Sequence, residues 1–180
     1  MRDIDLPPVI GLTGYASSGK DAVASVLERD HGYTRIAFAD PVKRIAFAIG
    51  WDGTKRPAGN YPPDVIQGRL LLQELGMACR EHIARGVFVA VARAHIDEVL
   101  ANEGRVVIPD VRFSNEVDLV RGYYGTVIRI DRPGVEPMRH ETERIDRLRI
   151  DVTLLNDGTL ADLDAKVDSA LMLITAGDAL

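Results

Sequence analysis

The amino-acid sequence predicts an α/β protein, a three-layer sandwich with a five-stranded, mostly parallel sheet between two layers of helices. Apolar runs rich in branched residues alternate with segments of helical periodicity along most of the chain. A glycine-rich turn that ends in a lysine joins the first apolar run to the first helical segment. The length of 180 residues fits one domain with a sizeable core, so we expect a single domain over residues 1–180.

Local sequence signals define the expected strands and helices. Pro7-Pro8 precede the first strand, Pro41 suits the first turn of a helix, and residues 51–63 are rich in proline and glycine, which predicts a loop. The predicted strands are 9–13, 35–39, 106–108, 126–130 and 152–155. The predicted helices are 20–31, 41 to about 50, about 64–85, 87–102, 114 to about 123 and about 160–175. This alternation indicates parallel strands joined through helices.

The composition excludes several classes of protein. With 22 Lys+Arg against 27 Asp+Glu, the net charge of −5 argues against a protein that grips nucleic acid through a basic face. The single cysteine, Cys79, cannot form an internal disulfide, which favours a reducing compartment. The N-terminus carries no targeting segment, and no apolar run reaches the ~18 residues of a membrane span. We therefore expect a cytoplasmic protein that binds neither nucleic acid nor membranes.

The turn after the first strand has the pattern G-x-x-x-x-G-K and predicts a phosphate-binding loop. Glycines let the backbone N–H groups surround phosphate oxygens at the positive end of the following helix, and the lysine can reach the β and γ phosphates. We expect ATP to contact Gly14, Tyr15, Ala16, Ser17, Ser18, Gly19, Lys20 and Asp21. Asp21 stands where a hydroxyl residue usually follows the lysine. Its carboxylate either serves Mg²⁺ or complements the helix dipole as a first-turn acid.

Further motifs, taken in order, narrow the family. They are F-A-D-P-V-K at 38–43, L-Q-E-L-G at 72–76 with Arg80, D-V-R-F-S-N-E at 110–116, I-D-R-P at 130–133 and N-D-G-T at 156–159. With the glycine-rich loop, this series resembles the deoxynucleoside monophosphate kinases of tailed bacteriophages from residue 11 to about 163. The resemblance implies the P-loop nucleoside monophosphate kinase fold and the reaction ATP + dNMP → ADP + dNDP with Mg²⁺. It also suggests a homodimer, located in the host cytoplasm if a phage encodes the protein.

Several charged residues are expected at the edge of the sheet where ligands bind. Asp40, Asp110 and Arg112 follow predicted strand ends, on the same edge as the glycine-rich loop. Asp110 stands where P-loop enzymes place an acid near Mg²⁺ or the attacking phosphate, although a turn-forming Asp explains it too. The resemblance adds Lys43 to the substrate side. Ser114 is expected to cap the next helix and Glu116 to complement its dipole.

The helix at 64–85 carries a polar stripe within a predicted helical substrate-binding region of about 40–103. At 100° per residue, Arg69, Gln73, Gly76 and Arg80 lie within about 60° of one another. Two guanidiniums and an amide, with a glycine leaving room between them, suit a flat base and a phosphate. A solvated helix face is the alternative, but such a face normally includes Glu and Lys.

Residues 132–149 predict an arginine-rich lid, with Gly134 as a hinge. Arginines from a closing lid can neutralise the transferred phosphate while excluding water, and Arg132 and Arg139 are the candidates, with His140 beside the substrate. A charged surface loop is the alternative, because acids are interspersed with the arginines. By resemblance, Asn156 faces the adenine of ATP, while Thr159 and Asp162 fit a helix cap.

Two other functions compete with a deoxynucleotide kinase. Another small-molecule kinase of the same fold, such as dephospho-coenzyme A kinase, would keep the same loop. A nucleotide-binding protein without turnover would not need both the lysine and the arginine-rich segment. A GTPase is disfavoured because no Asn-Lys-x-Asp motif is present, and a nucleic-acid motor because the chain is acidic.

Overall fold

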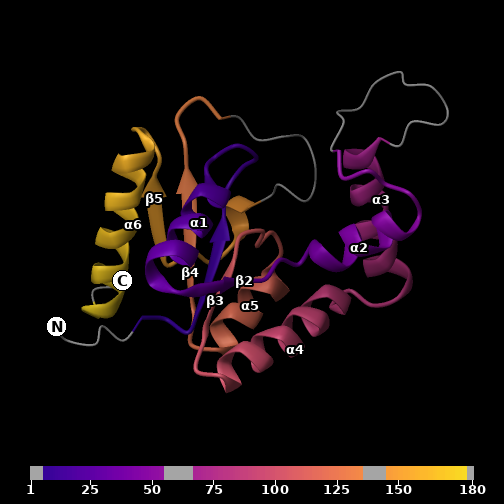
Figure 1. The fold of residues 1–180 in the computed structure, drawn as a ribbon, viewed down its shortest axis with the longest axis horizontal. Coiled ribbons are helices and arrows are strands. Elements are labelled where there is room, and N and C mark those ends of the chain that lie inside the picture. Colours follow the sequence, from indigo (N-terminus) through magenta and orange to yellow (C-terminus); the bar gives the residue numbers. More distant parts are fainter. Residues whose placement is uncertain (1–5, 55–66, 136–144, 178–180) are drawn as a thin grey trace. The chain divides into compact units, whose positions relative to one another are not determined.

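A computed structural model describes residues 6–54, 67–135 and 145–177 (Figure 1). The chain divides into two compact units. One unit comprises the described residues of Met1–Ala37 and Arg93–Leu180, and the other is the single stretch Phe38–Ala92. The first unit contains the sheet, and the second contains helices and their connections.

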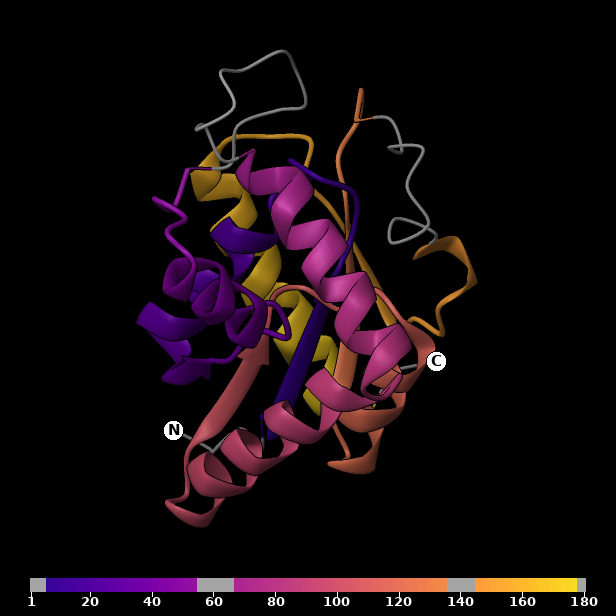
Figure 2. The same cartoon turned by 90° about the vertical axis from the view of Figure 1, so that its right-hand side faces the viewer.

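Five parallel strands form one sheet in the first unit, which confirms the predicted fold class. The strands are β1 (Val9–Thr13), β2 (Tyr33–Arg35), β3 (Arg105–Ile108), β4 (Thr126–Asp131) and β5 (Val152–Leu155). Their order is β2-β3-β1-β4-β5, and every pair is parallel. Figure 2 shows β1 and β3 alongside each other. Because β1 is central, the loop that follows it begins in the middle of the carboxyl edge of the sheet.

Helices cover both faces of this sheet, as the burial of all five residues of β1 requires. Ile10 and Leu12 pack into a core with α1 (Lys20–His31) and α6 (Leu160–Thr175). Gly11 points to the opposite face, where a Cβ would meet Val111 and Val120, and Val120 belongs to α5 (Ser114–Gly122). The core is built from branched aliphatic residues that are fully buried.

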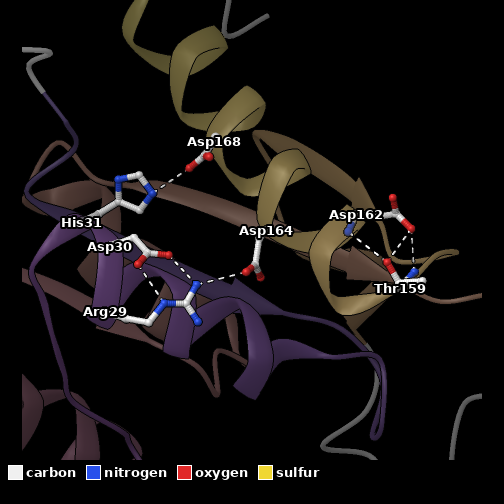
Figure 3. A network of polar contacts seen from close by, with 7 residues as sticks. All are labelled: Arg29, Asp30, His31, Thr159, Asp162, Asp164 and Asp168. Atoms are coloured by element: carbon white, nitrogen blue, oxygen red, sulfur yellow. Dashed lines mark hydrogen bonds and ion pairs between the residues drawn. The ribbon is translucent and has the colours of Figure 1, made fainter.

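Ion pairs on the surface join α1 to α6 (Figure 3). The Arg29 guanidinium bonds to Asp30 at 2.5 Å and to Asp164 of α6 at 3.0 Å, and His31 Nε2 lies 3.0 Å from Asp168 Oδ1. Arg29 and His31 stand in the last turn of α1, where positive charge also complements the helix dipole. Exposed pairs of this kind contribute little individually, so the apolar core remains the main cause of this packing.

The second unit consists of α2 (Asp40–Ala48), α3 (Gly68–His82) and the first residues of α4 (Val87–Ala101). Pro41 stands in the first turn of α2, as predicted. Trp51 packs inside this unit: it is 5% exposed, its ring centre lies 4.8 Å from that of Phe47, and its Nε1 donates to the Thr54 carbonyl.

Two predicted boundaries are wrong. The second strand covers Tyr33–Arg35 rather than 35–39, because α2 already begins at Asp40 and the chain must leave the sheet before it. A further ladder bond follows, from the Ile36 N–H to the Val107 carbonyl. The helix predicted to end at 85 ends at His82, and a turn between Ala84 and Val87 leads into α4.

No helix in the described ranges combines the length and the apolar character needed to span a lipid bilayer.

The packing of β1 against α5 predicts the effect of a side chain at Gly11. In Gly11→Ala, the new Cβ would lie 3.0 Å from methyl groups of both Val111 and Val120. We expect a loss of about 1–3 kcal/mol in the free energy of unfolding, measured by urea denaturation, because the overpacked core must shift. The matched control is Gly122→Ala, where nothing lies within 4 Å of the added Cβ. A loss at Gly122 as large as at Gly11 would contradict this account.

Candidate active site

The glycine-rich loop, Gly14–Lys20, adopts a backbone that its two glycines make possible. Gly14 has φ 143° and Gly19 has φ 108°, both in a region that residues with a Cβ rarely adopt. Space excludes a side chain as well: a Cβ on Gly14 would lie 2.4 Å from the Ile130 carbonyl oxygen. Ser17 also has a positive φ, 65°. These turns lead directly into α1, whose N-terminal N–H groups and dipole favour an anion.

Lys20 lies against the loop that precedes it. Its Nζ donates to the carbonyl of Gly14 at 2.7 Å and to that of Tyr15 at 2.6 Å. These bonds hold the ammonium within reach of any ligand that the loop surrounds. An incoming phosphate offers the ammonium stronger, charged acceptors than these neutral carbonyls.

Asn156 supports the loop from the segment after β5. Its Nδ2 donates to the Ser18 carbonyl at 2.8 Å, and its own N–H donates to the Asp131 carbonyl at 2.7 Å. A Cβ on Gly19 would lie 2.4 Å from this Nδ2, which gives Gly19 a second reason to be glycine. The amide of Asn156 therefore bonds to the loop backbone in the structure, and its contact with adenine stays a prediction. The predicted cap nearby is confirmed, because Thr159 and Asp162 form a capping box at the start of α6.

Asp146 and Arg129 anchor Tyr15 of the loop, and Asp131 holds Arg129 in place. The Tyr15 hydroxyl donates to Asp146 Oδ2 at 2.8 Å, and the Arg129 guanidinium lies over the Tyr15 ring, 5.6 Å from its centre. Arg129 in turn donates to Asp131 at 2.7 Å and to Asp146 at 2.9 Å. The hydrogen bond to Asp146, followed by burial, raises the pKa of Tyr15. The same bond and the one from Arg129 lower the pKa of Asp146.

Asp21 stands in the first turn of α1 and pairs with Arg35 at the end of β2. Arg35 NH1 lies 3.3 Å from Asp21 Oδ1, NH2 donates to the Asp21 carbonyl, and Nε donates to Glu28. The Asp21 side chain is 88% exposed, so its carboxylate is hydrated as well as paired. Both roles predicted for Asp21 therefore remain chemically open to it, while Arg35 offsets its negative charge beside the loop.

The D-V-R-F-S-N-E motif follows β3 and folds around Glu116. Asp110 and Arg112 are both half-buried here. The Glu116 side chain is 2% exposed and accepts the N–H of Arg112 at 2.7 Å and that of Phe113 at 3.1 Å. Glu116 thus serves the start of α5, as expected. The prediction that Ser114 caps this helix is wrong, because Phe113 holds the cap position and its carbonyl accepts the first N–H groups of the helix.

Five predicted substrate residues fall in the second unit, on α2 and α3. Lys43 pairs with Asp40 at 2.9 Å. Along the predicted stripe, Arg69 is exposed, whereas Gln73 and Arg80 are half-buried. The structure corrects the expectation that Gly76 leaves room for a base: Gly76 is buried, and the Arg80 guanidinium itself approaches it.

The predicted lid is only partly described. Arg132 is exposed just after β4 and precedes Gly134, which has φ 78°. Arg139 and His140 lie outside the described residues. Within the described ranges, no group of three or more His, Cys, Asp or Glu side chains could hold a metal ion.

Two arginines beside the glycine-rich loop were not singled out from the sequence as functional. Arg129 bonds Asp146, and Arg35 pairs with Asp21. Arg129 lies between two isoleucines of β4, which was a usable signal. Arg35 offered no such signal, because its partners lie at least seven positions earlier in the chain.

Solved structures of two other kinases have a similar fold over nearly their whole length. Shikimate kinase from Aquifex aeolicus is 15% identical, with a TM-score of 0.51 over 94% of this chain and 99% of that one. A gluconokinase from Sinorhizobium meliloti is also 15% identical, with a TM-score of 0.51 over 96% of this chain and 95% of that one. The parallel sheet, the glycine-rich loop after β1 and these likenesses place the protein in the P-loop kinase fold.

The sequence comparison is more specific than the fold. The family model for deoxynucleotide monophosphate kinases matches residues 62–167, more than half of the chain. A protein of Acanthamoeba polyphaga mimivirus, provisionally named a deoxynucleotide monophosphate kinase, is 28% identical to this chain. The alignment covers 91% of this chain and 95% of the viral protein. The chain belongs to the deoxynucleotide monophosphate kinase family and is a kinase, a phosphotransferase that uses a nucleotide.

The anchoring of Tyr15 predicts a pH-dependent contribution to stability. In Tyr15→Phe, loss of the bond to Asp146 should lower the free energy of unfolding by about 0.5–1 kcal/mol at pH 7. The folded pKa of Asp146 is lowered and that of Tyr15 is raised. The difference should therefore be constant between their ordinary pKa values, about 3.9 and about 10, and shrink outside that range.

The measurement is urea denaturation of both proteins at a series of pH values. Tyr124→Phe is the matched control, because that side chain is 92% exposed. An equal loss in both variants, or a Tyr15→Phe loss that first appears outside this pH range, would contradict the assigned role.

Proposed function

We propose that the protein transfers the γ-phosphate of ATP to a deoxynucleoside monophosphate, giving ADP and a deoxynucleoside diphosphate for phage DNA precursor synthesis. The observation that carries this proposal is the glycine-rich loop, with Lys20 bonded to its carbonyls at the start of α1. Family membership supports the choice of a deoxynucleotide as the acceptor.

The donor side of the proposed reaction uses the first unit. The N–H groups of Gly14–Gly19 surround the β and γ phosphates, and Lys20 exchanges its two carbonyl partners for phosphate oxygens. Asn156 holds the loop in place through Ser18. Asp131 and Asp146 keep Arg129 over Tyr15, so that the loop does not collapse when the lysine leaves its carbonyls.

The residues present fit Mg²⁺ as a cofactor. Mg²⁺ is usually bound through one or two carboxylates, waters and the phosphates of the nucleotide, so a site without a cluster of three acids is sufficient. Asp110, half-buried after β3, and Asp21 are the candidates to hold it. The ion would neutralise charge on the transferred phosphate.

Candidate residues for binding the acceptor are present in each unit. They are Asp40, Lys43, Arg69, Gln73 and Arg80 in the second unit, and Asp110 and Arg112 in the first. The arginines bind the monophosphate, because a guanidinium matches two phosphate oxygens at once. Gln73 and Asp40 can hydrogen-bond to a base or a sugar.

The transfer step itself needs positioning and charge neutralisation more than a strong base. The oxygen of the monophosphate attacks the γ-phosphorus in line, the bond to the β-phosphate oxygen breaks, and ADP leaves. Arg132 and Arg139 neutralise the charge that spreads over the γ-phosphate oxygens, with His140 beside the acceptor. A homodimer and a cytoplasmic location stay predictions.

An activity panel tests the proposal against its rivals. We expect ADP release with ATP, Mg²⁺ and at least one of dAMP, dGMP, dCMP and dTMP, and weaker or no release with ribonucleotides or dephospho-coenzyme A. Lys20→Ala should lower kcat by about 100-fold or more while the protein stays folded, because charge stabilisation is lost. Arg29→Ala, at the opposite end of the same helix, should leave activity unchanged. Absence of turnover with every monophosphate would overturn the proposal.

The surroundings of Asp21 and Asp110 differ enough to predict which of the two carboxylates binds Mg²⁺. Asp21 is 88% exposed and pairs with Arg35, whereas Asp110 is half-buried at the edge of the sheet. In Asp110→Asn, we expect the Mg²⁺ concentration for half-maximal rate to rise about 10-fold, and in Asp21→Asn less than about 3-fold. Titration of Mg²⁺ at saturating ATP measures this. The reverse order would assign the metal to Asp21 instead.

A further inference from the structure

The Arg80 guanidinium is held in one plane by two neighbours within the second unit. Its Cζ lies 4.7 Å from the centre of the Phe88 ring. Its NH1 donates to the Gly76 carbonyl, one helical turn earlier on α3, at 3.2 Å. Phe88 belongs to the first turn of α4, so residues from two helices fix one side chain.

Phe88 is well suited to hold the guanidinium still. Its side chain is 3% exposed, so packing fixes the ring. A guanidinium over an aromatic face is attracted to the electron-rich ring. This stacking uses the flat face of the guanidinium, whereas two-point binding of a phosphate uses its N–H edge. The two interactions are therefore compatible in the same side chain.

Gly76 contributes to the position of Arg80 because it has no side chain. A Cβ at this position would lie 3.3 Å from Arg80 NH1, closer than most real contacts, and 4.0 Å from Val42 of α2. The φ of Gly76 is ordinary, so backbone conformation does not require glycine here. The space that the missing side chain leaves lets the guanidinium lie close to its own helix.

We propose that Phe88 and Gly76 are positioning residues that hold the Arg80 guanidinium ready for the phosphate of the acceptor monophosphate. This inference rests on the proposed function, in which Arg80 binds the acceptor. An arginine that is ordered before the ligand arrives loses less side-chain entropy on binding. The benefit should appear in affinity for the acceptor and not in affinity for ATP.

A double-mutant cycle tests whether Phe88 acts through Arg80. In Phe88→Leu, which removes the ring but keeps an apolar side chain, we expect KM for the deoxynucleotide to rise about 3- to 10-fold, with KM for ATP unchanged. Gly76→Ala should change the acceptor KM in the same direction. Arg80→Lys should raise it as well, because an ammonium has no flat face. Adding Phe88→Leu to Arg80→Lys should then change the acceptor KM by less than about 2-fold.

Controls separate positioning from a general loss of stability. Ile96→Val alters a fully buried residue on the same helix α4 and should lower stability without changing the acceptor KM. Equilibrium titration with the same deoxynucleotide reports affinity independently of turnover. If Phe88→Leu fails to fold, Gly76→Ala carries the test.

The outcomes distinguish this inference from the proposed function. An unchanged acceptor KM in both Phe88→Leu and Gly76→Ala would overturn the positioning role. So would a double mutant in which the KM increases caused by Phe88→Leu and by Arg80→Lys multiply. In either case, turnover by the wild-type protein would still support the proposed kinase activity. If the wild-type protein neither turns over nor binds any monophosphate, both proposals fail together.

Discussion

The candidate site depends on a backbone that approaches its surroundings too closely for side chains. At Gly14 the chain lies against the carbonyl end of β4, and at Gly19 against the amide of Asn156. Both glycines also have φ values that other residues rarely adopt. The neighbouring β4 and the segment after β5 therefore leave no space for a side chain at either position. The central position of β1 in the sheet brings these neighbours within reach.

Charge is distributed around this loop as well as within it. Two acids next to the loop have arginine partners from other elements: Arg35 for Asp21, and Arg129 for Asp146. These pairs reduce the repulsion that an anionic ligand would otherwise meet, although their exposure keeps each interaction weak. A chain with a net charge of −5 can in this way bind an anionic ligand locally.

Much of the fold and part of the site could be predicted from the sequence. The sequence pattern located four of the five strands closely, because buried parallel strands leave continuous apolar runs. The second strand was displaced, because Tyr33–Arg35 is short and not an apolar run. The loop was predictable since its residues are contiguous. The partners of Tyr15, Asp21 and Arg80 were not, because Asp146, Arg35 and Phe88 come from other elements and their contacts depend on packing. Gly76 shows the limit clearly: periodicity placed it on the right face, but only the structure reveals that Arg80 fills its space.

The chain enters the second unit after β2 and leaves it before β3, so Phe38–Ala92 is one continuous stretch between these two strands in the sequence. None of the strands, nor any residue of the glycine-rich loop, belongs to it. Changes in this stretch can therefore accumulate during evolution without disturbing strand register or the loop. Under the proposed function, such changes would alter residues assigned to the acceptor on α2 and α3 while the loop assigned to ATP keeps its sequence.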